Sequence, residues 1–206
     1  GYAELIETGI AKPEDTPGFA RKIHVEASRM IQLVNDILQL SHLDNVSETG
    51  AAPAMETVDL LDVARECVER QKVNARHSYI SLTYLGESAP VTGSRVLLDE
   101  LCQNLCDNAI RYNRPGGKVQ IITACTRDGH CTLTVKDNGI GIPKEAQTSV
   151  FERFYRVDKS RSKATGGTGL GLAIVKHIAR IHNARIKLDS VVDEGTTITV
   201  IFETAS

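Results

Sequence analysis

A stripe of polar side chains follows one face of a long helix predicted over residues 94–112. Glu100, Asn104, Asn108 and Arg111 recur at spacings of four, four and three residues, so a helix places them in one line. Asparagine is a mediocre helix former, and two of them one turn apart beside an apolar face indicate ligand binding. Amide oxygens are hard ligands suited to Mg²⁺, which usually binds few protein groups plus phosphate and water. The alternative for this stripe, taken alone, is a solvated polar face.

A second polar cluster lies where a predicted strand ends. Asp137 is followed by a turn with two spaced glycines, Gly139 and Gly141, before Pro143 opens a helix. A carboxylate at a strand end can accept a hydrogen bond from an exocyclic amine, and glycines let the backbone approach a flat ligand. An ordinary strand-to-helix turn is the alternative, because Asp-Asn-Gly is a common turn sequence.

The third cluster is rich in glycine and leads into a helix. Gly167, Gly169 and Gly171 precede the helical segment, whose free N–H groups and positive dipole end suit phosphate oxygens. No Gly-Lys-Ser/Thr follows, so the cluster is not a Walker loop, and it does not sit at the first strand of a βαβ unit as a Rossmann fingerprint would. A glycine-rich hinge is the alternative. Residues 151–163, just before this cluster, hold five basic and two acidic side chains and are typical of a flap that places cations on phosphates.

The elements that must position these clusters alternate between helical and strand periods. The predicted segments are a short strand over 55–58, helices over 60–75, 94–112 and 169–182, and strands over 79–85, 118–126, 131–136, 186–191 and 196–203. Helices on one face of a mixed, mostly antiparallel sheet make an α+β sandwich, which we assign to residues 55–206.

Residues 1–44 precede this domain and are predicted to form a helical hairpin, and the small, polar residues 45–54 a linker. Apolar residues recur at spacings of four and three in the second helix, as in a bundle seam. They are Ile23, Ala27, Met30, Val34 and Ile37. One full-length helix cannot bury such a seam alone, so a partner helix is implied, most simply from a second copy of the chain.

Composition excludes several classes of protein. The net charge of −2 argues against a nucleic-acid binder, and no apolar run approaches the ~20 residues of a membrane helix. Gly1 is not an initiator methionine, so we expect the chain to be part of a longer protein. Five cysteines without a CxxC pair predict buried free thiols in a reducing compartment rather than zinc or disulfides.

Four motifs in this order resemble the catalytic part of bacterial two-component sensor histidine kinases, most closely the membrane-sensor type related to phosphate-regulation and cell-wall kinases. The N box matches at 104–112, the G1 box at 137–143, the F box at 151–156 and the G2 box at 167–172, while residues 1–44 resemble the dimerisation helices.

The resemblance implies a Bergerat ATP-binding fold that takes ATP or ADP with Mg²⁺. Asn108, helped by Asn104, would hold the metal. Arg111 would contact phosphate, although the family more often has lysine there. The remaining implied nucleotide-binding residues are Tyr112, Asp137, Gly139, Gly141, Ile142, Arg156, Gly167, Thr168, Gly169, Leu170 and Gly171. Asp137 would bind the adenine amino group, and Arg156 would reach the phosphates from the lid.

The implied reaction moves the γ-phosphoryl of ATP to a histidine and then to an aspartate of a response-regulator receiver domain. The resemblance also implies a homodimer through the helical bundle and a cytoplasmic domain of a membrane-anchored sensor, which would meet the membrane only through upstream segments. None of the six histidines stands in the family's His-acid-x-x-Thr-Pro setting. We therefore expect residues 1–44 to be a truncated hairpin, and the chain to bind ATP without phosphorylating itself.

Two alternatives to the kinase have different consequences. ATP hydrolases of the same superfold, such as gyrase, Hsp90 and MutL, carry a water-activating glutamate where this chain has Asn104, whose amide cannot accept a proton at neutral pH. A non-catalytic interaction module that recruits a partner through the bundle helix predicts no nucleotide binding.

Overall fold

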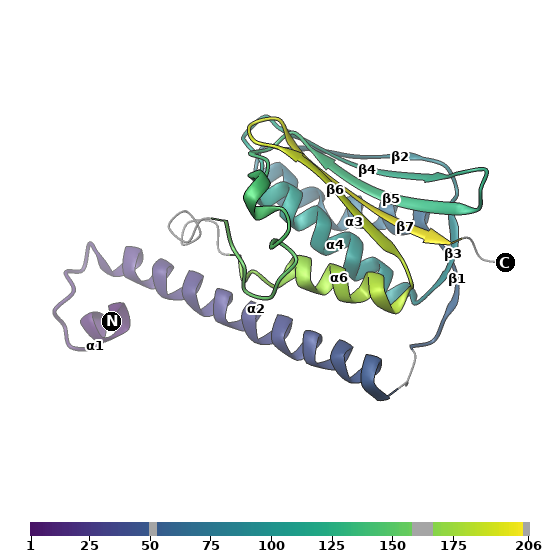
Figure 1. The fold of residues 1–206 in the computed structure, drawn as a ribbon. Coiled ribbons are helices and arrows are strands. Elements are labelled where there is room, and N and C mark those ends of the chain that lie inside the picture. Colours follow the sequence, from purple (N-terminus) through teal and green to yellow (C-terminus); the bar gives the residue numbers. More distant parts are fainter. Residues whose placement is uncertain (50–52, 158–166, 204–206) are drawn as a thin grey trace.

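The computed structural model describes residues 1–49, 53–157 and 167–203. Its main body has two layers, a five-stranded sheet in the order β2-β4-β5-β7-β6 and three helices on one face of it (Figure 1). The strands are β2 (Ser81–Gly86), β4 (Lys118–Cys125), β5 (His130–Asp137), β6 (Arg185–Val191) and β7 (Gly195–Glu203), and the helices are α3 (Leu60–His77), α4 (Arg95–Arg111) and α6 (Gly171–Ile181). Only the β2–β4 pair is parallel, so the predicted mixed, mostly antiparallel α+β sandwich is confirmed.

The core lies between the helices and the inner face of the sheet, and it is mainly aliphatic. Every second residue of β4 and β5 points inward, and Val119, Ile121 and Leu133 are at most 1% exposed. Helix α4 covers them with Leu101 and Leu105. Each such side chain contributes roughly 1.5–3 kcal/mol through burial, so packing rather than helix propensity fixes where the polar stripe of α4 faces.

A second, two-stranded sheet joins β1 (Glu56–Asp59) to β3 (Pro90–Gly93). The short β3 escaped sequence prediction, because a four-residue strand that begins with proline has too few positions to show an alternation. Asp59 connects this sheet to α3, since its Oδ1 accepts hydrogen bonds from the N–H groups of Leu61 and Ala89 at 2.9 and 2.8 Å.

Two helices, α1 (Tyr2–Glu7) and α2 (Thr16–Thr49), precede the sheet domain. Helix α2 continues five residues beyond the predicted boundary at 44, and positions 50–52 of the predicted linker lie outside the described residues. Figure 1 shows α2 running beside α6, where Leu40 and Leu43 join the core. The opposite side of α2 is apolar and exposed, with Met30, Ile31, Val34, Ile37 and Leu38 each at least 44% accessible.

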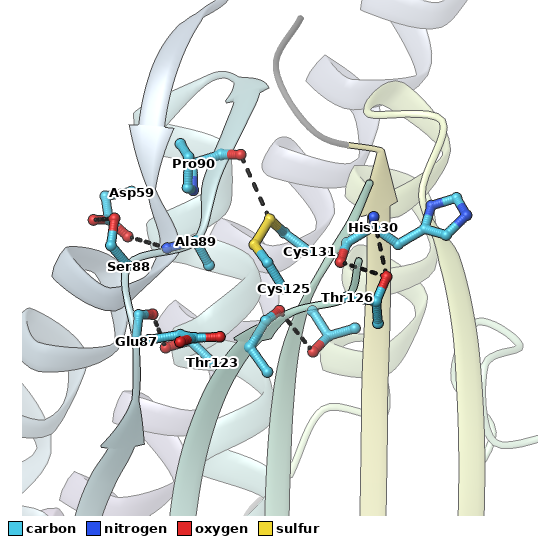
Figure 2. Close-up of a disulfide and its surroundings, with 12 residues drawn as sticks. Asp59, Glu87, Ser88, Ala89, Pro90, Thr123, Cys125, Thr126, His130 and Cys131 are labelled. Carbon is cyan, nitrogen blue, oxygen red and sulfur yellow. Dashed lines mark hydrogen bonds between the residues drawn. A yellow bond between two sulfur atoms is a disulfide. The ribbon is translucent and has the colours of Figure 1, made fainter. Parts of the chain in front are cut away.

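The cysteine prediction was wrong for one pair. Cys125 and Cys131 form a disulfide across the β4–β5 hairpin (Figure 2), because the strand register places them directly opposite each other with their Cα atoms 4.1 Å apart. The other three cysteines are buried free thiols, as predicted, at Cys67, Cys102 and Cys106. No helix in the described ranges is both long and apolar enough to cross a bilayer.

Candidate functional site

The asparagines of α4 face the first residue of α6. A Cβ atom added to Gly171 would lie 3.0 Å from Asn104 Oδ1 and 3.4 Å from Asn108 Nδ2, so only glycine keeps the space beside both amides open. The amide nitrogen of Asn104 donates to the Glu100 carbonyl at 3.0 Å, which directs Oδ1 toward α6. Two half-buried amides beside a helix N-terminus fit a hard cation that also binds phosphate.

Two cations and a tyrosine converge at the C-terminal end of α4. A Cβ atom on Gly167 would lie 2.9 Å from Arg111 Nη1, 3.2 Å from the Tyr112 hydroxyl and 3.6 Å from Arg156 Nη2. Arg156 also donates to the Gly167 carbonyl. The N box, F box and G2 box therefore meet at one glycine, and their guanidinium groups create an anion-binding environment next to α6. Residues 158–163 of the predicted flap lie outside the described residues.

Asp137 ends β5 and presents a carboxylate between two backbone donors. Its Oδ1 accepts hydrogen bonds from the N–H groups of Gly139 at 2.8 Å and Thr196 at 3.3 Å. Burial raises the pKa of Asp137, and these two hydrogen bonds oppose that rise. Since both contacts use Oδ1, Oδ2 is the oxygen that can accept an exocyclic amine.

The glycine turn after Asp137 packs against the turn between β6 and β7. Gly141 has φ +68°, and a Cβ atom there would collide with the Val191 carbonyl. Gly195 has φ +121°, and a Cβ atom there would collide with the Asp137 carbonyl. Glycine is therefore required on both sides of this contact, and the two turns pack backbone against backbone.

Sequence reasoning missed the side chains that hold this turn. Ser190 Oγ accepts the N–H of Ile142 at 2.8 Å and lies 2.9 Å from the hydroxyl of Thr196. Gln147 donates from Nε2 to the carbonyls of Ile142 and Ser190, both at 2.9 Å. A serine in a strand and a glutamine in a loop give no local signal of this network, because it depends on the position of β6.

The predicted G2 residues divide into three environments. Leu170 is fully buried in the core, so only its backbone can reach a ligand. Gly169 accepts a hydrogen bond at its carbonyl from the N–H of Phe154 at 3.0 Å, which joins it to the F box. Thr168 donates from Oγ1 to Asp36 Oδ2 of α2 at 2.6 Å, a contact that the sequence did not predict.

Residues 93–206 match the family described as histidine kinase-, DNA gyrase B- and HSP90-like ATPase. Sensor-like histidine kinase SenX3 of Mycolicibacterium smegmatis is 42% identical over 96% of this chain and 51% of its own length. The solved mycobacterial sensor histidine kinase MprB is 32% identical, with a TM-score of 0.63 over 73% of this chain and 97% of its own.

A further solved structure, the histidine kinase AdeS of Acinetobacter baumannii, matches over 100% of this chain and 93% of its own with a TM-score of 0.77. Its identity is 22%, so it supports the fold alone. The chain spans about half the length of the SenX3 proteins that it matches.

Proposed function

The chain belongs to the histidine kinase-, DNA gyrase B- and HSP90-like ATPase family, among its sensor histidine kinases, and from this premise we propose that it binds Mg·ATP for phosphoryl transfer to histidine. The observation that carries the proposal is the convergence of three motifs around Gly167, with the two asparagines of α4 beside Gly171. Cations, hard oxygen donors and a helix N-terminus then surround one position that suits a triphosphate.

Each residue has a role that follows from its place. Asp137 Oδ2 would accept the adenine amino group, while the Tyr112 ring would line the nucleotide pocket. Arg111 and Arg156 would balance phosphate charge, and Asn104 and Asn108 would offer amide oxygens to Mg²⁺, which neutralises phosphate charge when bound. In the transfer, a histidine nitrogen forms a bond to the γ-phosphorus as the bond to the bridging oxygen breaks, so that ADP leaves. Positioning and charge neutralisation provide most of the catalysis.

We further propose that the chain works as a homodimer and passes its phosphoryl group to a response-regulator receiver domain. The exposed apolar side of α2 supports dimerisation, because its five large side chains need a covering surface. The names of the relatives as sensors support placement on the cytoplasmic side of a membrane-anchored protein.

The hydrolase alternative is not favoured. Asn104 holds the position of the water-activating glutamate, and its amide nitrogen is already bonded to the Glu100 carbonyl. Neither amide atom can take a proton from water at neutral pH.

Nucleotide binding and transfer test the proposal separately. Calorimetry should show binding of Mg·ADP and Mg·ATP to the 206-residue chain. Asn108→Ala should reduce the gain in nucleotide affinity that Mg²⁺ provides. Labelled ATP should give an acid-labile phosphoryl group on a histidine-bearing helical bundle supplied in trans. Steady release of phosphate at an enzyme-like rate without that label would instead support hydrolysis, and no binding of nucleotide would overturn the proposal.

A further inference from the structure

The disulfide between Cys125 and Cys131 lies at the turn end of the β4–β5 hairpin, and its two sulfur atoms differ in access (Figure 2). Cys131 is 0% exposed, whereas Cys125 is half-buried. The pairing of β2 with β4 ends at Gly86 and Thr123, two residues before Cys125, so β2 does not cover the edge of β4 there. A reagent from solvent therefore reaches the bond from the Cys125 side.

The backbone holds the two cysteines opposite each other independently of the bond between their sulfur atoms. The N–H of Thr126 donates to the His130 carbonyl at 2.8 Å, and the N–H of His130 donates to Thr126 Oγ1 at 3.3 Å. These hydrogen bonds close the hairpin directly beyond the disulfide, while β4 and β5 remain paired on its other side. Two thiols left by reduction would therefore stay adjacent, and this proximity favours closing the bond again.

The surroundings also provide a partner for the thiol that reduction would create at Cys131. Its Sγ lies 3.7 Å from the Pro90 carbonyl, which can accept a weak hydrogen bond from an S–H group. The preceding residue is fixed by the N-terminal cap of α3, because the Ala89 N–H donates to Asp59 Oδ1 at 2.8 Å and Ser88 Oγ donates to Asp59 Oδ2 at 2.6 Å. The acceptor therefore keeps its place whether the disulfide is open or closed.

A disulfide at this position contrasts with the compartment expected for the chain. The cysteine pattern predicts a reducing compartment, and the proposed function places the chain on the cytoplasmic side of a membrane. Disulfides in the cytosol, when present, are usually transient and catalytic or redox-sensing. The three free thiols are each 0% exposed, so burial protects them from exchange. They are Cys67, Cys102 and Cys106.

We propose that Cys125 is a thiol-exchange site, at which a low-molecular-weight thiol opens the disulfide reversibly. The inference goes beyond the nucleotide site and uses only the proposed cytoplasmic placement. The thiolate of the small thiol forms a bond to Cys125 Sγ as the bond between Cys125 and Cys131 breaks. The electron pair of that bond goes to Cys131 Sγ, which takes up the proton that the attacking thiol released.

A second molecule of the small thiol completes the reaction. Its thiolate attacks the sulfur of the first molecule, and Cys125 leaves as a thiolate that takes up the second proton. The protein disulfide has then gained two electrons and two protons, and two small thiols have become one small-molecule disulfide. The reverse sequence, which begins with oxidised small thiol at Cys125, closes the protein disulfide again.

The exchange site and the proposed nucleotide site lie at opposite ends of β5. Cys131 and Asp137 are six residues apart on this strand, which at about 3.4 Å per residue separates them by roughly 20 Å. Opening the disulfide should therefore loosen the turn end of the hairpin and leave the affinity for Mg·ADP unchanged. This separation distinguishes a failure of the exchange site from a failure of the proposed function.

Equilibration of the wild-type 206-residue chain with mixtures of reduced and oxidised glutathione tests the inference. Alkylation of free thiols followed by mass spectrometry should show the disulfide open in excess reduced glutathione and closed again in excess oxidised glutathione. Circular dichroism should remain native throughout. A bond that persists until the protein is unfolded would be a permanent structural disulfide, and that result would overturn the inference.

Two matched variants test the assignment to Cys125. With oxidised glutathione, Cys131→Ser should gain about one glutathione per chain, on Cys125. Cys125→Ser should gain none while folded, because Cys131 is inaccessible. Equal labelling of the two variants would contradict the assignment, and the wild-type equilibrium decides the question if either variant does not fold. Calorimetry should give the same Mg·ADP affinity for oxidised and reduced wild type. Absence of nucleotide binding in both states would refute the proposed function and leave the exchange site standing.

Discussion

The backbone N–H of Thr196 donates a hydrogen bond to Asp137 Oδ1, which joins β7 to the end of β5 across 59 residues of sequence. The same carboxylate oxygen accepts the Gly139 N–H, so both backbone donors fix one orientation of the side chain. The other oxygen, Oδ2, is the one that would accept the adenine amino group in the proposed site. The pairing of β5 with β7 therefore sets the orientation of this carboxylate.

Replacing Asp137 with asparagine should remove this acceptor. With Oδ1 retained by the two backbone N–H groups, the new amide nitrogen would face the donor of the adenine and oppose it. Loss of a hydrogen bond to a charged group costs about 1.5–3 kcal/mol, so calorimetry should show Mg·ADP binding weakened about 10- to 100-fold. The matched control is Asp189→Asn on the exposed side of β6, which should bind as wild type does, and equal affinities in both variants would contradict the role of Asp137.

Ser190→Ala should loosen the glycine turn without unfolding the domain. The substitution removes the acceptor of the Ile142 N–H and a partner of Thr196, and each lost hydrogen bond costs about 1 kcal/mol. We expect nucleotide affinity to fall about tenfold. Thr134→Ala, which breaks a hydroxyl pair with Thr199 elsewhere in the sheet, should lower the melting temperature and leave affinity unchanged. A Ser190→Ala protein with native affinity would show that the glycine turn after Asp137 keeps its conformation without the Ser190 hydroxyl.

Gly141→Ala should be far more damaging than an equivalent change at Gly116. Both glycines have positive φ, +68° and +80°, but a Cβ atom at Gly116 has no neighbour within 4 Å, whereas at Gly141 it collides with Val191. The backbone conformation alone costs about 1–2 kcal/mol in both variants. Chemical denaturation should therefore show a larger loss for Gly141→Ala, and equal losses would refute the close packing of the two turns.

Reduction of the Cys125–Cys131 disulfide should lower stability modestly. The loop that it closes spans six residues of sequence separation, and chain entropy for so short a loop gives about 2 kcal/mol. Thermal unfolding with and without dithiothreitol measures the change. A double Cys125→Ser, Cys131→Ser variant should show no response to the reductant, and a wild type that is equally insensitive would show that the bond contributes nothing.

Glu100→Gln should make the protein more stable at high pH only. Burial raises the pKa of Glu100 from its ordinary value of 4.5 to about 7, so folding disfavours the charged form. The loss of folding stability that comes from burying the ionised carboxylate is absent below pH 4.5. It grows between pH 4.5 and 7 and is complete above about pH 7. Melting temperatures of the variant and wild type should agree near pH 4.5 and separate by pH 8, with the variant higher. The opposite order at pH 8 would contradict the burial of this carboxyl group.

The parts of the site that sequence could predict are those with a local pattern. The i, i+4 spacing on α4 places Asn104 and Asn108 on one face in any helix, and the alternation in β4 and β5 carries Asp137 to a strand end. A glycine flanked by polar residues predicts a turn for the same reason, because the backbone conformation of a turn depends on its own few residues.

The parts that could not be predicted depend on register and docking. Ser190 reaches Ile142 only because β6 pairs with β7 at a particular offset. Cys125 and Cys131 become partners through the same kind of register, which a count of cysteines does not contain. Asp36 resembles any polar residue of an amphipathic helix, and its burial arises from packing of α2 on a domain that begins beyond it in sequence.

Helix α2 is long, and its contact with Thr168 through Asp36 is sensitive to rotation of the helix about its axis. At 34 residues the helix is about 50 Å long, and its side chains extend roughly 5 Å from the axis. A twist of about 30° would carry the Asp36 carboxylate through an arc of roughly 3 Å, more than the hydrogen bond to Thr168 can tolerate. A rotation of α2 of that size would therefore break the contact between the helical hairpin and the glycine-rich segment before α6.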